Sequence, residues 1–284
     1  MSMSNNMTED QALKRLIKKA AQDLVKSKFA IALTGAGMST ESGIPDFKGP
    51  SGLWTKNPQA ETIEPLKASQ SYQALLADPQ KWWQERLTHP SQSSIHREKA
   101  VPNQGHYALA EMEDMMVLLF VITSNVDGLH EKAGTQCVIE FHGSFLKLRC
   151  ISCGTRFRRE EFDLEKLIQK NDLPPRCPTC QGIIKPDGVS FGEAIPADVQ
   201  YKSTFFSNRC DVMLICRTTA SVFPFAELPR IAKQRGARII EVNTEPTRLT
   251  KEGISNYIIQ GRTGEVLPQI VAEIKKLKQG EKVS

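Results

Sequence analysis

Short apolar runs without alternating polar residues recur along the chain at 29–33, 117–123, 212–216 and 237–242. A strand that is apolar on both faces is usually buried on both, as in a parallel sheet covered by helices. Apolar residues at helical spacing lie between and after these runs, over 8–25, 106–115, 226–235 and 267–277. Thr8 and Gln11 are suited to a capping box at the start of the first helix. The pattern predicts an α/β fold, a parallel sheet with helices on both faces.

Two segments interrupt this alternation of strand and helix. Residues 51–99 contain no convincing strand, and their aromatic residues and leucines have a spacing suited to short helices. Residues 147–186 contain four of the seven cysteines. Both segments are predicted to be insertions, which leaves a core made of 1–50, 100–146 and 187–284.

The composition argues against some partners. The 37 lysines and arginines exceed the 32 aspartates and glutamates, for a formal net charge of +5, and the basic residues are spread along the chain. Nucleic-acid-binding domains usually carry a more clustered positive charge, so we expect no specific nucleic-acid binding. The first ten residues are polar, and the longest apolar run, 115–122, is too short to cross a bilayer. We therefore expect a cytoplasmic chain without membrane association, in which thiols stay reduced.

The cysteines in the second insertion form two CxxC pairs, Cys150 with Cys153 and Cys177 with Cys180, separated by 23 residues. Two such pairs supply the four thiolates of a tetrahedral zinc site, and a site with four protein ligands has no open position for substrate. This spacing predicts one structural zinc ion. A disulfide pair or a redox-active CxxC remains the alternative.

A glycine-rich turn, Gly35-Ala36-Gly37, follows the first apolar run. Glycines allow the backbone to approach a pyrophosphate, and the N-terminus of a following helix supplies N–H donors. The third glycine of the usual dinucleotide fingerprint would fall at Thr40, so the turn alone is equally compatible with a structural strand-to-helix connection. The extension 41–49 is rich in glycine, proline and polar residues, which favours a loop that closes over a ligand.

Polar residues follow the second apolar run, where Ser124, Asn125 and Asp127 would lie at the carboxyl end of a buried strand. Ligands of open α/β sheets bind at such ends. Further along, His142 precedes a glycine and is a candidate general base, because the pKa of histidine lies near neutral pH. These patterns alone do not select among the five histidines, His89, His96, His106, His130 and His142.

Several of these motifs together resemble those of the sirtuins. They are GAGMSTESGIPDFKG (35–49), TSNVDGLHEKAG (123–134), EFHGS (140–144), the two CxxC pairs, KPDGVSFGE (185–193), FPFAELP (223–229) and EVNTEPT (241–247). They occur in the sirtuin order and at similar spacing, and the resemblance covers roughly residues 10–275.

The resemblance implies a Rossmann-type NAD-binding domain made of 1–50, 100–146 and 187–284. A small domain would combine the helical insertion, 51–99, with the zinc-binding module, 147–186. NAD and an acyl-lysine protein or peptide would meet in the cleft between the two domains. The products would be nicotinamide, free lysine and an acyl-ADP-ribose. The residues 82–86 lack the Tyr and Arg pair of sirtuins that prefer acidic acyl chains, so acetyl is the default acyl group.

The resemblance also assigns roles to individual residues. His142 would be the catalytic base, and Asn125 would share the catalytic site. The cofactor would contact Gly35, Ala36, Gly37, Ser39, Glu41, Ile44, Pro45, Asp46, Phe47, Ser124, Asn125, Asp127, Thr218, Thr219, Asn243, Glu245 and Thr263. The substrate peptide would pair in strand fashion with Val189, Ser190, Phe191 and Gly192.

Four positions depart from the sirtuin pattern. Ser124 replaces a Gln, Lys48 an Arg, Gly188 a Val and Arg217 a Gly. Gly188 removes a side-chain contact with the substrate. Arg217 either adds a phosphate clamp or obstructs the cofactor. Two other functions therefore stay open beside deacylation: a mono-ADP-ribosyltransferase or NAD hydrolase, and a catalytically weakened NAD-binding module.

Overall fold

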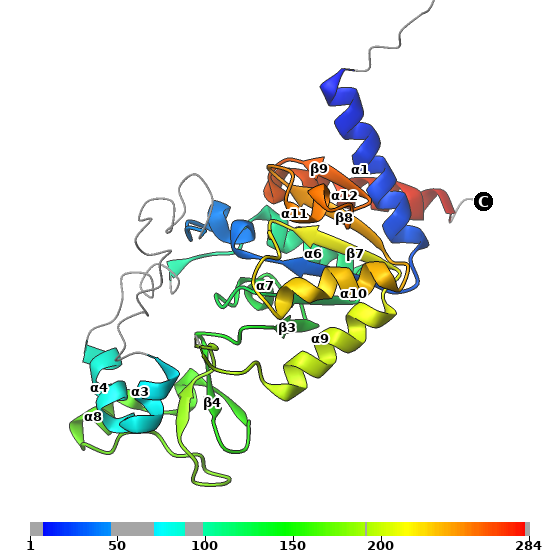
Figure 1. Cartoon of the computed structure of the whole chain (residues 1–284). Helices are drawn as coiled ribbons and strands as arrows, with labels where there is room; N and C mark the ends of the chain where they lie inside the picture. Colours follow the sequence, from blue (N-terminus) through cyan, green and yellow to red (C-terminus); the bar gives the residue numbers. More distant parts are fainter. Residues whose placement is uncertain (1–7, 47–70, 89–98, 191, 282–284) are drawn as a thin grey trace, which may run out of the picture.

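A computed structural model describes residues 8–46, 71–88, 99–190 and 192–281 (Figure 1). Its large sheet has six parallel strands in the order β3-β2-β1-β7-β8-β9. The strands are β1 (Ala30–Thr34), β2 (Phe120–Thr123), β3 (Val138–Glu140), β7 (Val212–Cys216), β8 (Arg238–Asn243) and β9 (Tyr257–Gln260). The four apolar runs form β1, β2, β7 and β8, which confirms the predicted parallel sheet.

Helices cover both faces of this sheet. One face packs against α1 (Glu9–Lys26), α6 (Gln104–Asp114) and α12 (Thr263–Glu281). The other packs against α9 (Ala197–Arg209) and α10 (Leu228–Gln234). Successive residues of β1 alternate between the two cores, with Ala32 in the first and Leu33 in the second. Thr8 and Gln11 form the predicted capping box of α1.

The short elements of the large domain lie around the ends of these strands. They are the 3-10 helices η1 (Ala36–Ser42) and η5 (Phe225–Glu227) and the short helices α7 (Leu129–Lys132) and α11 (Arg248–Lys251). The predicted helix at 226–235 is therefore divided, because η5 occupies its first turn. None of the helices that the structure describes is long and apolar enough to cross a membrane.

A second, smaller unit lies beside the large sheet, at the lower left of Figure 1. Its antiparallel sheet has the order β5-β4-β6, with the strands β4 (Lys147–Cys150), β5 (Arg156–Arg158) and β6 (Ile184–Pro186). The helical elements of this unit are α3 (Tyr72–Ala77), α4 (Pro79–Thr88), η4 (Arg159–Glu161) and α8 (Leu164–Gln169).

The small unit has a core of its own that joins the two insertions. Trp83 of α4 is fully buried and packs in the same cluster as Leu148 of β4 and Cys177. The indole Nε1 of Trp83 donates a hydrogen bond to the carbonyl of Ile184, at 2.9 Å. Helices from one insertion are thus bonded to the sheet of the other.

Candidate active site

The carboxyl ends of four neighbouring parallel strands meet at one edge of the large sheet. The strand register aligns Thr34 at the end of β1 with Thr123 of β2 and with Cys216 of β7. Asn243 ends the next strand, β8. The chain order reverses between β1 and β7, and open α/β sheets bind ligands at this kind of edge. All the predicted cofactor residues that the structure describes, except Thr263, lie at or after these four strand ends.

The glycine-rich turn between β1 and η1 is pressed against the loop after β7. An added Cβ at Gly35 would lie 2.5 Å from Cβ of Thr218, and one at Gly37 would lie 2.8 Å from Nε of Arg217. The N–H groups of Gly35 and Gly37 donate to the carbonyls of Cys216 and Arg217, each at 3.2 Å. Glycine is therefore required here for close packing, and these two N–H groups already have protein acceptors.

A buried polar network joins three of the predicted residues. Asn125 Nδ2 donates to the Gly35 carbonyl and to Ser39 Oγ, both at 3.1 Å. Ser39 Oγ donates to Asp127 Oδ2 at 2.7 Å, and Asp127 Oδ1 accepts the N–H of Leu129 at 3.0 Å. The exposed fractions of Asn125, Ser39 and Asp127 are 7%, 1% and 5%. Such a network costs free energy unless every member is bonded, so its side chains are held in one arrangement.

His142 lies next to this network, because its Nδ1 is 3.2 Å from the carbonyl of Ser124. With Nδ1 donating to that carbonyl, the neutral imidazole has its acceptor at Nε2. Burial lowers the pKa of His142, and the bond to Ser124 opposes part of this shift. The ring of Phe225 lies 6.0 Å away, centroid to centroid. His142 is thus a partly buried base that is unprotonated at neutral pH.

Steric crowding explains why a glycine, Gly143, follows this histidine. Gly143 has a φ of +70°, and an added Cβ would lie 2.2 Å from the carbonyl oxygen of Asp187. The backbone of Asp187 therefore lies directly against the residue that follows His142.

The other two described histidines, His106 and His130, form a buried pair with ring centroids 4.9 Å apart. His130 Nε2 is 2.9 Å from Thr34 Oγ1. Burial lowers the pKa of His106 to about 4 despite the attraction of Asp127, and burial together with His106 lowers the pKa of His130 well below its usual value. Both rings are neutral and packed at neutral pH. Of these three histidines, His142 is the most exposed.

Four of the predicted cofactor residues lie at or just after the ends of β7 and β8. Asn243 Nδ2 donates to the carbonyl of Thr218 at 3.3 Å, and both residues are buried. Thr219 and Glu245 are exposed. The structure therefore places these four predicted residues at two adjacent strand ends, where Thr218 and Asn243 are hydrogen-bonded to each other.

The remaining predicted cofactor residues lie on η1 and at the start of α12. Glu41 accepts the N–H of Gly264 at 3.0 Å, which ties η1 to the first turn of α12. Thr263 is fully buried, and its Oγ1 has no hydrogen-bond partner among the described residues. The N–H of Ile44 donates to the Ser39 carbonyl at 3.2 Å, and Pro45 and Asp46 follow. Phe47 lies outside the described residues.

Of the predicted substrate residues, Val189 is bonded to the segment that contains His142. Its N–H donates to the carbonyl of His142 at 2.8 Å. Ser190 is held by Glu193, which accepts the N–H of Ser190 at 2.9 Å. Gly192 has a φ of +80°. Phe191 lies outside the described residues.

The side chain of Arg217 lies across the glycine-rich turn. Its Nε donates to the Gly37 carbonyl at 3.3 Å, and its Nη1 donates to Asn243 Oδ1 at 3.4 Å and to Thr244 Oγ1. Its backbone has a φ of +50°, in the left-handed region that favours glycine. All its side-chain acceptors in the described part of the chain are neutral, so the guanidinium lies among predicted cofactor residues without an anionic partner.

The four cysteines of the two CxxC pairs converge in the small unit, with all their Sγ atoms within 4.8 Å of one another. Sγ of Cys150 is 3.5 Å from that of Cys180, and Sγ of Cys153 is 3.7 Å from that of Cys177. Tetrahedral ligands with zinc–sulfur bonds of about 2.3 Å would lie about 3.8 Å apart, whereas a disulfide requires about 2.05 Å. These cysteines therefore fit one structural zinc ion.

Residues 35–224 match the model of the Sir2 family. The chain belongs to the Sir2 family.

The relatives of this Sir2-family chain span nearly its whole length. It is 41% identical, over 253 residues, to NAD-dependent protein deacylase 2 of Pyrobaculum aerophilum, covering 89% of this chain and 94% of that protein. A solved Sir2 homologue in complex with NAD has a TM-score of 0.69 at 38% identity, covering 92% of this chain and 94% of that one. A Sir2 protein bound to a myristoylated histone peptide has a TM-score of 0.64 at 33% identity, covering 94% and 99%.

Two departures from the sirtuin pattern have local explanations in this Sir2-family chain. An added Cβ at Gly188 would lie 2.7 Å from Cε1 of Phe145, so the phenyl ring fills the place of a side chain there. A larger residue at position 188 would therefore clash with this ring. Ser124 Oγ donates to the Thr34 carbonyl at 3.3 Å. Lys48 lies outside the described residues.

The sequence patterns do not single out Asn103, which holds the predicted cofactor loop of this Sir2-family chain. Asn103 caps α6, and its Nδ2 donates to the Met38 carbonyl at 2.8 Å and to Ser42 Oγ at 3.0 Å. It thus fixes both halves of η1. An asparagine immediately before a helical pattern predicts an N-cap, but its long-range acceptors have no signal in the sequence.

Proposed function

We propose that this chain is an NAD-dependent protein-lysine deacylase that produces nicotinamide and an O-acyl-ADP-ribose. The observation that carries the proposal is the buried network of Asn125, Ser39 and Asp127 at the carboxyl edge of the sheet, with His142 beside it. The comparisons support it, because the chain aligns with NAD-dependent protein deacylases along their length.

The residues present fit NAD. Gly35 and Gly37 contribute no side chains of their own to the turn, and Asn125 of the buried network donates to the Gly35 carbonyl behind it. NAD supplies a ribose carbon that becomes electrophilic when nicotinamide leaves. We propose that Asn125 and Asp127 orient the nicotinamide ribose, and that burial of this network keeps water away from it.

His142 is the proposed general base. Its Nδ1 is 3.2 Å from the Ser124 carbonyl, which leaves Nε2 as the atom that accepts a proton from a ribose hydroxyl. The substrate peptide is proposed to bind along Val189, Ser190 and Gly192, next to the backbone of His142. Acetyl-lysine is the first substrate to test, because residues 82–86 lack the Tyr and Arg pair of sirtuins that prefer acidic acyl chains.

The zinc ion is proposed to have a structural role, held by Cys150, Cys153, Cys177 and Cys180. Because four thiolates complete its shell, no catalytic step passes through it. We also propose a cytoplasmic location, on the ground that four reduced thiols are needed for this site.

The test of the function is product identification. The purified protein is incubated with NAD and an acetyl-lysine peptide, and the products are followed by mass spectrometry. Formation of O-acetyl-ADP-ribose together with the deacetylated peptide supports the proposal. ADP-ribose on protein or free in solution would indicate a transferase or NAD hydrolase instead. NAD binding without turnover would indicate a binding module.

Arg217 is proposed to be a phosphate clamp. Its guanidinium has neutral acceptors, and its Nε is 3.3 Å from the Gly37 carbonyl in the turn where the pyrophosphate is expected. Hydrogen bonds to charged groups contribute roughly 1.5–3 kcal/mol, so Arg217→Gly should weaken ADP-ribose binding by about 10- to 100-fold. Isothermal titration calorimetry measures this, with Arg248→Gly, an exposed arginine on α11, as the matched control. Tighter binding by the Arg217→Gly protein would show that the side chain obstructs the site.

A further inference from the structure

Three cations stand in one row across the sheet of the small unit. In the strand register, Arg149 of β4 pairs with Arg156 of β5 on one side and with Lys185 of β6 on the other. Residues directly opposite each other in adjacent strands project from the same face, where like charges are destabilising. Arg149 and Lys185 are also buried, with exposed fractions of 8% and 1%. A row of this kind requires anions opposite it.

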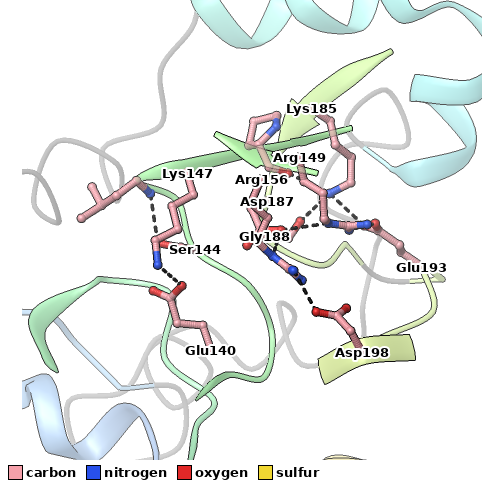
Figure 2. A network of polar contacts seen from close by, with 12 residues as sticks. Glu140, Ser144, Lys147, Arg149, Arg156, Lys185, Asp187, Gly188, Glu193 and Asp198 are labelled. Atoms are coloured by element: carbon pink, nitrogen blue, oxygen red, sulfur yellow. Dashed lines mark hydrogen bonds and ion pairs between the residues drawn. The ribbon is translucent and has the colours of Figure 1, made fainter. Parts of the chain in front are cut away.

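The anions come from the segment that follows β6 (Figure 2). Asp187 accepts from Arg149 at 2.8 Å and lies 3.3 Å from Nε of Arg156. Glu193 lies 2.5 Å from Nη2 of Arg149 and 3.1 Å from Nζ of Lys185. Asp198 of α9 accepts from Arg156 at 3.0 Å. The charges therefore balance, three cations against three carboxylates.

Lys185 does more than neutralise charge, because its ammonium has three acceptors. Nζ donates to the carbonyls of Pro186 and Gly188, both at 2.8 Å, and contacts Glu193. The same oxygen of Glu193, Oε2, also accepts the N–H of Ser190 at 2.9 Å. One buried cation and one carboxylate thus fix the backbone of the segment at three points between Pro186 and Ser190.

This backbone is the one that contacts His142. The N–H of Val189, between the two points fixed at Gly188 and Ser190, donates to the His142 carbonyl at 2.8 Å. A Cβ added at Gly143 would lie only 2.2 Å from the Asp187 carbonyl oxygen. The position of the segment and that of the histidine backbone are therefore set together.

We propose that Lys185 is a positioning residue, which holds the 186–190 backbone in the form that binds an acyl-lysine peptide and keeps His142 in register with it. This inference rests on the proposed deacylase function. Lys185 acts through the backbone that it holds and has no contact with the reacting atoms.

The state of this lysine depends on pH. Burial lowers the pKa of Lys185 to about 8, against the attraction of Glu193, and Arg149 adds to the lowering while Asp187 opposes it. Below about pH 8 the ammonium has three donors for its three acceptors, whereas the neutral amine above that pH has two. The segment should therefore loosen as the pH rises through this value.

The test compares Lys185→Met with Lys170→Met, which removes an exposed lysine of the same unit. In Lys185→Met the KM for an acetyl-lysine peptide should rise about tenfold or more, because the carbonyls of Pro186 and Gly188 lose the donor that holds the peptide-binding backbone. The Kd for ADP-ribose and the zinc content should not change. The Lys170→Met protein should behave as wild type. Unchanged peptide KM in a folded Lys185→Met protein would overturn the proposal, and so would an equal loss of ADP-ribose affinity, which indicates a general structural role.

Measurements over a range of pH separate a positioning role of Lys185 from a role only in the stability of the fold. For the wild type, the peptide KM should rise above about pH 8, and in Lys185→Arg, whose side chain stays protonated, this rise should be absent. The same alkaline rise in both proteins would overturn the proposal. If Lys185→Met does not fold, Glu193→Gln is measured in its place, with the same expected rise in peptide KM and the same contradicting results.

Failure of the proposed function is distinguishable from failure of this inference. Peptide affinity is measured by fluorescence polarisation in the presence of ADP-ribose. A wild-type protein that neither binds nor deacylates the peptide contradicts the function and the inference together. A wild-type protein that does both, beside a Lys185→Met protein of equal affinity, contradicts the positioning role alone.

Discussion

Replacement of His142 by alanine is expected to lower kcat for deacylation by about 10²–10⁴-fold, the usual contribution of a general base. The affinity for ADP-ribose should stay within about twofold, because the buried network of Asn125, Ser39 and Asp127 has no bond to the imidazole. Steady-state kinetics gives kcat, and calorimetry gives the Kd for ADP-ribose. A His142→Ala protein with wild-type kcat would contradict the assignment of this residue as the base.

The pH dependence of the wild type gives an independent check of the same residue. A base works in its neutral form, and burial lowers the pKa of His142 below its usual value of 6.5. The neutral form therefore still predominates at pH 6.5, and the midpoint of the acidic fall in kcat/KM should lie below that value. A midpoint above pH 6.5 would contradict the observed surroundings of this ring.

Removal of zinc is expected to unfold the small unit while the large sheet remains. Structural zinc contributes roughly 10–16 kcal/mol of apparent free energy in zinc-finger peptides, more than a small core of this kind supplies. Cys150 and Cys177 are themselves members of the core that contains Trp83, so loss of the ion removes ligands and packing together. Cys177→Ser, or treatment with a strong chelator, should abolish binding of the acyl-lysine peptide.

Tryptophan fluorescence reports this unfolding, because Trp82 and Trp83 are 5% and 0% exposed in the small unit. Their emission should shift to longer wavelength when zinc is removed. Cys137→Ser is the matched control, since Cys137 is an exposed cysteine outside the four-cysteine cluster. A zinc-free protein with unchanged emission and peptide affinity would show that the four thiols hold no structural ion.

The central part of the fold follows from local sequence patterns. The strands β1, β2, β7 and β8 are predicted because each is apolar on both faces. The strand β3 has only three residues, and β9 lies at the sheet edge with half-buried positions, so neither has a strong hydrophobic pattern. The capping box of α1 is predicted correctly, because it depends on residues three positions apart.

The candidate site is predictable only where residue type and strand ends coincide. Asn125 and Asp127 are predicted because they follow a buried strand directly. The direction of the Arg217 side chain is not predictable, since it depends on Gly37 of η1 and Asn243 of β8, which are distant in the sequence. The row that includes Lys185 is also missed, because the register of β4 and β6 is set by the fold and not by nearby residues.

The most direct test of the proposed deacylase function is to measure the release of nicotinamide from NAD with and without an acetyl-lysine peptide. A site in which the acyl-lysine amide attacks the ribose carbon next to His142 should release nicotinamide only when the peptide is present. One nicotinamide should appear for each lysine deacetylated, and the non-acetylated peptide should give none. Release of nicotinamide at the same rate in the absence of any acetyl-lysine peptide would contradict the account.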